Sequence, residues 1–208
     1  MKIIKKLITL FTFTIVLNQA FSQSIQLSPY SGYTFSNKIS IDGGTAKISG
    51  GHTFGGILTV ALPINYNFEI LYSRHINEVT ASSTMLVEDF RSDAAYNYIL
   101  AGFNRIIHIP NTGLKFYGGP KFGATILSSI DDKFSTRTNF AVALDAGMVL
   151  MVNNFIGLRV GANVKAPIVN SGVNLWWGTG SGPQVGVSSW SPIAQFNLLG
   201  GIVINIGL

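Results

Sequence analysis

The stretch Leu158-Arg-Val-Gly-Ala-Asn-Val-Lys-Ala-Pro-Ile168 carries the pattern on which the fold depends. Every second residue from Leu158 to Ile168 is apolar, whereas the residues between them include Arg159, Asn163 and Lys165. Successive side chains of a β-strand point to opposite faces, so this stretch predicts a strand with one apolar face and one polar face.

The same alternation returns along the chain in segments of about ten residues, the length of strand that crosses a membrane. Leu114–Ile126 and Phe196–Leu208 both repeat the pattern. We therefore expect eight strands, over residues 25–35, 52–62, 67–79, 94–108, 114–127, 138–151, 155–168 and 192–208. In the fourth of these both faces carry apolar residues, so its facing is ambiguous and a bulge can occur there.

The connections between these strands are alternately short and long. Proline, asparagine or glycine marks each short one, and the long ones are rich in glycine, serine, threonine and aspartate. The short connections are Pro63–Tyr66, Ile109–Gly113 and Val152–Asn154, and the long ones are 36–51, 80–93, 128–137 and 169–191. Three tight turns and four long loops require an even number of strands. This layout predicts an all-β fold, an eight-stranded antiparallel up-and-down transmembrane β-barrel.

The amino-acid composition favours hydrocarbon rather than water outside this barrel. Only 11% of the 208 residues are charged and 47% are hydrophobic, whereas the surface of a small soluble domain is about 25–35% charged. The sequence has no uninterrupted run of about 18 apolar residues, which excludes a bundle of spanning helices. A soluble barrel of the lipocalin kind, with its apolar face inward, is the alternative.

Aromatic residues fall near both ends of the expected strands, where the interfacial girdles of a membrane barrel lie. Beside the short turns are Tyr66, Phe68, Phe116 and Phe155, and near the long loops are Tyr33, Phe35, Phe54, Phe140, Trp176, Trp177 and Trp190. Aromatic residues are also common in strands of every kind, which is the alternative explanation.

The start of the chain is predicted to be a secretory signal peptide. It has a lysine-rich start at Lys2–Lys6, an apolar core at Leu7–Leu17 and a small-residue cleavage site at Ala20–Ser22. We therefore divide the chain into a signal peptide, 1–22, and an outer-membrane barrel domain, 23–208. Export followed by insertion into the outer membrane is the expected location.

The charge and cysteine content exclude several classes of function. The predicted signal peptide holds three of the 14 basic residues, which leaves 11 against 9 acidic ones and a net charge of +2. A nucleic-acid partner is therefore not expected, although the sequence pI is about 9.5. The chain has no cysteine, and its three histidines lie on different strands without ligand spacing, so we predict no cofactor and no metal site.

Seven charged residues fall on the polar faces of the expected strands and are predicted to project into the lumen. They are Glu69, Arg105, Lys115, Lys121, Asp145, Arg159 and Lys165. The interior of an eight-stranded barrel is just wide enough for side chains to fill. Charges in such a site must pair and form hydrogen bonds, either as a structural plug of ion pairs or as an ion-conducting constriction.

One strand resembles part of an enzyme family. Ser73-Arg-His-Ile-Asn-Glu78 resembles the His-x-Ser-Asn strand of the lipid A deacylases, which are eight-stranded outer-membrane serine esterases. Asn77 stands where that resemblance demands the serine nucleophile, and the nearest substitute is Ser73, two residues before His75. An esterase needs a hydroxyl hydrogen-bonded to a base that an acid orients. We therefore predict no catalytic residue and no enzymatic activity.

The whole mature chain resembles the small outer-membrane β-barrel proteins of Bacteroidota, the PorT-like group. The resemblance rests on a lysine-led signal ending at Gln23, on the stretch Tyr117-Gly-Gly-Pro-Lys-Phe-Gly123, and on the final alternating strand Phe196–Leu208. That strand resembles a barrel-insertion signal but ends in leucine instead of phenylalanine. The resemblance implies an integral surface protein and supplies no catalytic residues. Some members of the group serve in protein secretion and gliding.

The favoured function is therefore a monomeric, non-enzymatic barrel that contacts outer-membrane lipid and lipopolysaccharide. Its longest external loop, 169–191, with Trp176, Trp177 and Trp190, is the predicted contact for a protein partner or for the lipopolysaccharide surface. Anchoring at the membrane interface is the alternative role of these tryptophans. The alternative functions are a narrow pore for ions or small solutes and a lipid A-modifying hydrolase.

Overall fold

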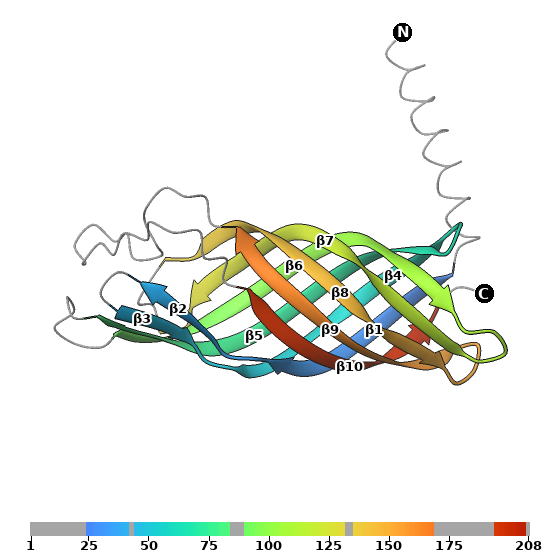
Figure 1. Ribbon diagram of the computed structural model, residues 1–208, viewed down its shortest axis with the longest axis horizontal. Coiled ribbons are helices and arrows are strands. Elements are labelled where there is room, and N and C mark those ends of the chain that lie inside the picture. The colour runs from blue at the N-terminus through green and yellow to red at the C-terminus, as the bar shows by residue number, and fades with distance from the viewer. Residues whose placement is uncertain (1–23, 42–43, 84–89, 132–134, 169–193, 207–208) are drawn as a thin grey trace, which may run out of the picture.

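The structure, a computed structural model, describes residues 24–41, 44–83, 90–131, 135–168 and 194–206 (Figure 1). The predicted signal peptide and the three tryptophans lie outside these ranges. The described strands are β1 (Ile25–Thr34), β2 (Asn37–Ile41), β3 (Gly44–Ile48), β4 (Gly51–Leu62), β5 (Tyr66–Ser83), β6 (Phe90–His108), β7 (Leu114–Ser129), β8 (Arg137–Met151), β9 (Ile156–Ile168) and β10 (Gln195–Asn205). In this part of the chain, no helix is long and apolar enough to cross a membrane.

Eight long strands close into an antiparallel barrel, which lies along the horizontal direction of Figure 1. β1 pairs with β4, each later strand pairs with the next, and β10 pairs back with β1. The predicted fold class is therefore confirmed. β5 and β6 each continue about four residues further toward the long connections than their alternation indicated.

The long connection 36–51 is not the irregular loop that its composition predicted. It forms β2 and β3, which continue the β1–β4 ladder in the same register, with Asn37 opposite Ile48. β3 also pairs with the end of β5, where Ile48 lies opposite Val79. The glycines that favoured a loop, Gly44 and Gly51, begin strands β3 and β4. The ladder extends past the barrel at the left of Figure 1.

Side chains of each spanning strand alternate between the outer wall and the lumen. On β9, Leu158, Val160 and Val164 are exposed, whereas Arg159 and Lys165, in the opposite phase of the strand, are buried. The outer wall is thus a band of large apolar side chains, and the charged residues of this strand face inward. This is the arrangement that a hydrocarbon surrounding requires.

Aromatic side chains lie at both ends of this apolar band. Exposed rings near the tight turns are Tyr66, Phe103, Phe116 and Phe155, and those near the long connections are Tyr33, Phe35, Phe54, Phe140 and Phe196. Neighbouring rings touch, since the centroids of Phe35 and Phe196 are 5.4 Å apart and those of Phe68 and Phe103 are 5.3 Å apart. Such rings suit the interface between hydrocarbon and water.

β6 is the strand whose facing the sequence left ambiguous. Tyr96, Tyr98 and Leu100 point into the lumen and are at most 2% exposed, while Phe103 faces outward. Its registers with β5 and β7 are continuous, so the described ladder contains no bulge there. The prediction that Arg105 projects into the lumen is wrong, because it shares the outward phase of Phe103.

Arg105 instead supports the tight turn between β4 and β5. Its guanidinium donates a hydrogen bond of 3.1 Å from Nη1 to the Ile64 carbonyl oxygen and lies 5.0 Å from the centre of the Tyr66 ring. In this turn Ile64 and Asn65 have φ of 63° and 60°. Asparagine tolerates such angles, but a β-branched residue rarely adopts them, so Ile64 is a strained position at the barrel rim.

We expect Val160→Arg to destabilise the barrel because it places a cation against the acyl chains near the middle of β9. The free energy of unfolding in lipid vesicles should fall by about 2–4 kcal/mol. Ile156→Arg, on the same face at the tight-turn end of the strand, should cost about 0–1 kcal/mol. Equal losses at the two positions in a urea titration would contradict the outward facing of this strand.

Candidate functional site

Four charged side chains from four strands meet in one layer of the lumen, which we call the charged layer. They are Glu69 of β5, Lys121 of β7, Asp145 of β8 and Arg159 of β9, and none is more than 2% exposed. Arg159 donates two hydrogen bonds to Glu69, from Nη1 to Oε1 and from Nη2 to Oε2, each 3.0 Å long. Lys121 Nζ lies 2.8 Å from Asp145 Oδ2 and 3.1 Å from Glu69 Oε2.

The charged layer has no net charge, because it holds two carboxylates and two cations. Arg159 also approaches Asp145, with 3.7 Å between Nη2 and Oδ2, so every member contacts at least one opposite charge. Burying charges costs free energy unless their remaining polar atoms are also satisfied. Glu69 meets this condition, since Asn104 Nδ2 donates to Glu69 Oε2 over 2.8 Å and Thr59 Oγ1 donates to Glu69 Oε1 over 3.2 Å, whereas Asp145 Oδ1 has no hydrogen-bond partner among the described residues.

Tyr117 of β7 contacts the guanidinium of Arg159 inside the lumen. Arg159 Nε donates to the Tyr117 hydroxyl over 3.1 Å, and the guanidinium carbon lies 4.1 Å from the ring centre. The ring fits because Gly147 and Gly161, which pair across β8 and β9, leave room for it. A Cβ on Gly161 would lie 2.2 Å from the tyrosine hydroxyl, and one on Gly147 would lie 2.5 Å from it.

A second polar group lies further along the lumen, toward the long connections. Lys165 Nζ donates to Ser73 Oγ over 2.7 Å and lies 4.7 Å from the centre of the Tyr98 ring. The hydroxyl of Tyr98 donates in turn to Gln195 Oε1 over 2.9 Å. On β5, Leu71 separates Ser73 from Glu69 and belongs to a contiguous apolar cluster. The two polar groups are therefore separate.

The geometry around His75 differs from that of a serine esterase. Its ring stacks on Tyr96, with centroids 4.9 Å apart, and on Tyr98 at 5.9 Å. Neither ring nitrogen has a hydrogen-bond partner among the described residues, and Ser73 bonds to Lys165 instead. The same part of the chain holds no group of three or more histidine or acidic side chains placed to bind a metal ion.

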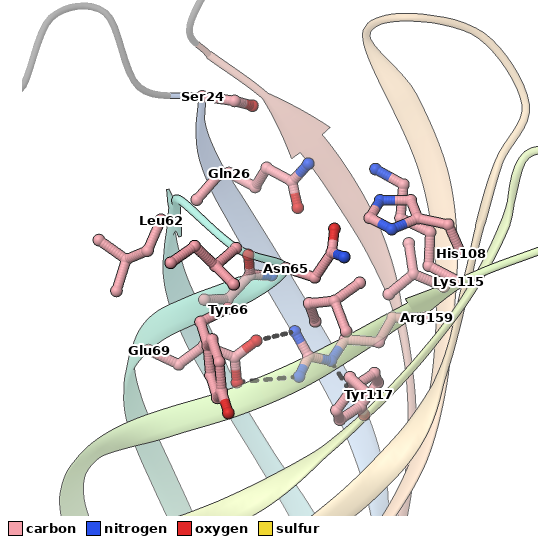
Figure 2. A pocket seen from close by; sticks show the side chains of 15 residues that line it. Ser24, Gln26, Leu62, Asn65, Tyr66, Glu69, His108, Lys115, Tyr117 and Arg159 are labelled. Carbon is pink, nitrogen blue, oxygen red and sulfur yellow. Dashed lines mark hydrogen bonds and ion pairs between the residues drawn. The ribbon is translucent and has the colours of Figure 1, made fainter.

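The tight-turn end of the lumen contains a cavity of about 260 Å³. Glu69, Arg159 and Tyr117 form its inner end, as Figure 2 shows by the dashed hydrogen bonds between them. Lys115, one of the residues predicted to project inward, is half-buried and lines this cavity, outside the charged layer. The structure thus brings four of the seven predicted residues together and distributes Lys115, Lys165 and Arg105 elsewhere.

Several neutral residues of the site could not be selected from the sequence. Asn104, Tyr98 and Gln195 carry no charge and stand in no motif, and Tyr117 is uncharged as well. Each of the four bonds to or orients a charged or polar lumen side chain. The sequence indicates them only by their place in the alternation, because they lie between the outward-facing residues of β6, β7 and β10. For Tyr117, the two glycines of Tyr117-Gly-Gly119 are a further indication, because glycine in a strand often marks a place where another group approaches the backbone closely.

The closed ladder, the apolar outer wall and a lumen filled by side chains define the fold of a small transmembrane β-barrel of the bacterial outer-membrane type. Two solved structures with this fold cover most of the chain. Neisserial surface protein A is 13% identical over 88% of this chain and 97% of its own, with a TM-score of 0.57. The outer-membrane protein OprG from Pseudomonas aeruginosa is 11% identical over 89% and 96%, with a TM-score of 0.56.

These similarities show the fold alone, because identities of 11–13% do not carry a function from one chain to another. No protein-family model matches the chain, and no curated protein matches its sequence. The resemblance to the PorT-like group therefore stays a prediction.

The charged layer should respond to paired substitutions as one unit. Glu69→Gln leaves two cations with one carboxylate, and Lys121→Met leaves two carboxylates with one cation, so each should cost about 3–5 kcal/mol. The double variant keeps one cation and one carboxylate, Arg159 and Asp145, and should lose less than the sum by about 0.5–3 kcal/mol. Urea unfolding in vesicles measures all three, and strictly additive losses would contradict the network.

The close packing of Tyr117 against Gly161 leads to a second prediction. Gly161→Ala should push the tyrosine ring away from Arg159 and lower the free energy of unfolding by about 1–3 kcal/mol. Gly200 is the matched control, since a Cβ there meets nothing within 4 Å. Gly200→Ala should be neutral or stabilise the strand by about 0.5–1 kcal/mol. Equal effects of the two substitutions would contradict the contact.

Proposed function

We propose that this protein is an integral, non-enzymatic β-barrel of the outer membrane that presents its long connections at the cell surface. The observation that carries the proposal is the outer wall, an exposed band of large apolar side chains with aromatic rings at both ends. A monomeric soluble protein rarely exposes an apolar patch of more than a few hundred Å². Hydrocarbon is the surrounding in which such a wall is stable.

The interior supports a structural role. The charged layer cancels its own charges, and Leu71, Leu100, Ile57 and Leu199 belong to the apolar cluster that fills the lumen. A tightly filled interior stabilises the wall and obstructs wide passage, as expected of eight strands. Each spanning strand pairs on both sides, so one chain satisfies its own backbone, which supports a monomer.

The long connections are the proposed interaction region. β5 and β6 extend beyond the barrel there, together with β2 and β3, and present ladder-paired backbone outside the apolar band. Residues 169–193, which include Trp176, Trp177 and Trp190, lie outside the described part of the chain. We propose that this end contacts lipopolysaccharide and a protein partner, in secretion or in envelope function, because rigid scaffolds usually carry their binding residues on loops.

Membrane fractionation tests the location. The protein should sediment with the outer membrane, and without boiling it should migrate faster in gel electrophoresis than after boiling, because a closed ladder resists detergent. The heated sample is the control for the unfolded mobility. A compact protein that stays soluble in buffer without detergent would overturn the proposal.

Proteolysis on intact cells tests the orientation. Proteinase K should cut within residues 169–193 and leave the tight turn Ile109–Gly113 intact, because that turn is proposed to face the periplasm. Permeabilised cells provide the control, in which both ends are accessible. Cleavage at the tight turns alone in intact cells would reverse the orientation.

A narrow pore is the second candidate. Polar side chains line the lumen toward the long connections, and atoms of His75, Asn77 and Tyr96 lack partners among the described residues, a setting that water can occupy. Planar-bilayer recording separates the two functions. A sealed barrel gives no current. Discrete current steps that disappear in Arg159→Ala would favour the pore.

A lipid A-modifying hydrolase is the third candidate and the least supported. The described residues hold no hydrogen-bonded serine–histidine pair at Ser73 and His75. Lipid A extracted from cells that overproduce the protein should be unchanged in mass. Loss of an acyl chain, abolished by Ser73→Ala, would reinstate the enzyme.

A further inference from the structure

The cavity at the tight-turn end has polar side chains without a hydrogen-bond partner among the described residues. Gln26, Asn67 and Lys115 line it, and none of them makes a side-chain hydrogen bond or ion pair to another residue of the described ranges. Asn65 lines it as well, and its backbone, at φ 60°, is fixed by the carbonyl hydrogen bond from Ile106. These amide and ammonium groups are available to a solute.

The charge of the cavity wall comes from Lys115. Glu69 is the acidic residue that lines the cavity, and its carboxylate is already bound by Arg159 and Lys121. Arg159 is likewise committed, because it donates to Glu69 and to Tyr117. Lys115 is half-buried and has no carboxylate partner in the described structure. The vacant part of the wall therefore carries a positive charge.

The position of these groups suits one small molecule. Figure 2 shows Gln26, Asn65, His108 and Lys115 gathered on the side of the cavity that lies away from the Glu69–Arg159 pair. Lys115 and His108 are paired positions of neighbouring strands, so their side chains share one edge. The volume of about 260 Å³ is below the roughly 300–1,000 Å³ of sites for drug-sized ligands.

The geometry points to a binding site for a small hydroxylated carboxylate, entered from the tight-turn end of the barrel. The carboxylate pairs with the Lys115 ammonium, which supplies a charge-assisted hydrogen bond. The amides of Gln26 and Asn65 both donate and accept, and they bond to the hydroxyl groups. The closed charged layer forms the inner end and keeps the solute from passing along the lumen.

Calorimetric titration of the full-length mature barrel in detergent micelles tests this site. Glucuronate is the probe, and glucose is its neutral counterpart with the same ring. Glucuronate should bind with a Kd near the millimolar range, as expected for so small a ligand, and glucose at least about tenfold more weakly. Equal binding of the two sugars, or no heat from glucuronate, would overturn the proposal.

Matched variants locate the site. Lys115→Gln should weaken glucuronate binding at least about tenfold, and Lys115→Arg should keep it, because the charge is retained. Gln26→Leu should also weaken binding while leaving the preference for glucuronate over glucose. Heat-dependent gel migration verifies that each variant is folded.

Arg74→Gln is the control for unspecific attraction. Arg74 lies on β5 between the buried Ser73 and His75, so it faces outward and does not line the cavity, and its loss should leave the affinity unchanged. An equal loss of affinity in Arg74→Gln and Lys115→Gln would mean general charge attraction to the barrel and would overturn the cavity site. Binding in this cavity requires only the folded barrel, so the result does not depend on whether the long connections contact a partner.

Discussion

A backbone that crosses hydrocarbon finds no water to bond its N–H and C=O groups, and this constraint governs the rest of the molecule. The β1–β10 pairing meets it by closing the ladder, so that every spanning strand is bonded on both sides. Closure with eight strands in turn fixes a narrow interior. The side chains that face inward must fill that space, and any charge among them must find its partner within it.

The fold could be predicted because this constraint leaves a period of two in the sequence. The alternation in β7, β9 and β10 gave both the strands and their facing. β6 was ambiguous for the opposite reason: Tyr98 and Leu100 are needed as bulky fillers of the lumen, so polarity no longer distinguishes its faces. Polarity alone therefore predicts the inner face for Arg105, which lies on the outer one. The β2–β3 hairpin was missed because glycine at strand ends looks like glycine in a loop.

The candidate site was predictable in its members but not in its connections. Alternation alone brought Glu69, Lys121, Asp145 and Arg159 to the inner face. It could not tell which carboxylate meets which cation, because that depends on the stagger between strands far apart in sequence, such as β5 and β9. Alternation also could not predict that Lys165, which is six residues from Arg159 on the same face, bonds to Ser73 and not to the charged layer. The neutral partners, such as Asn104 and Tyr117, are indicated in the sequence mainly by their place in the alternation.

The unequal strand lengths have a geometric consequence. β5 and β6 have 18 and 19 residues, whereas β9 and β10 have 13 and 11. A tilted strand needs about 9–11 residues to cross the bilayer, so the longer pair rises roughly 20 Å above it. Among the described residues, one side of the rim therefore continues as a paired sheet beyond the bilayer, whereas the paired backbone of β9 and β10 ends close to it. A large molecule that approaches along the membrane plane from the β5–β6 side meets side chains carried on paired strands.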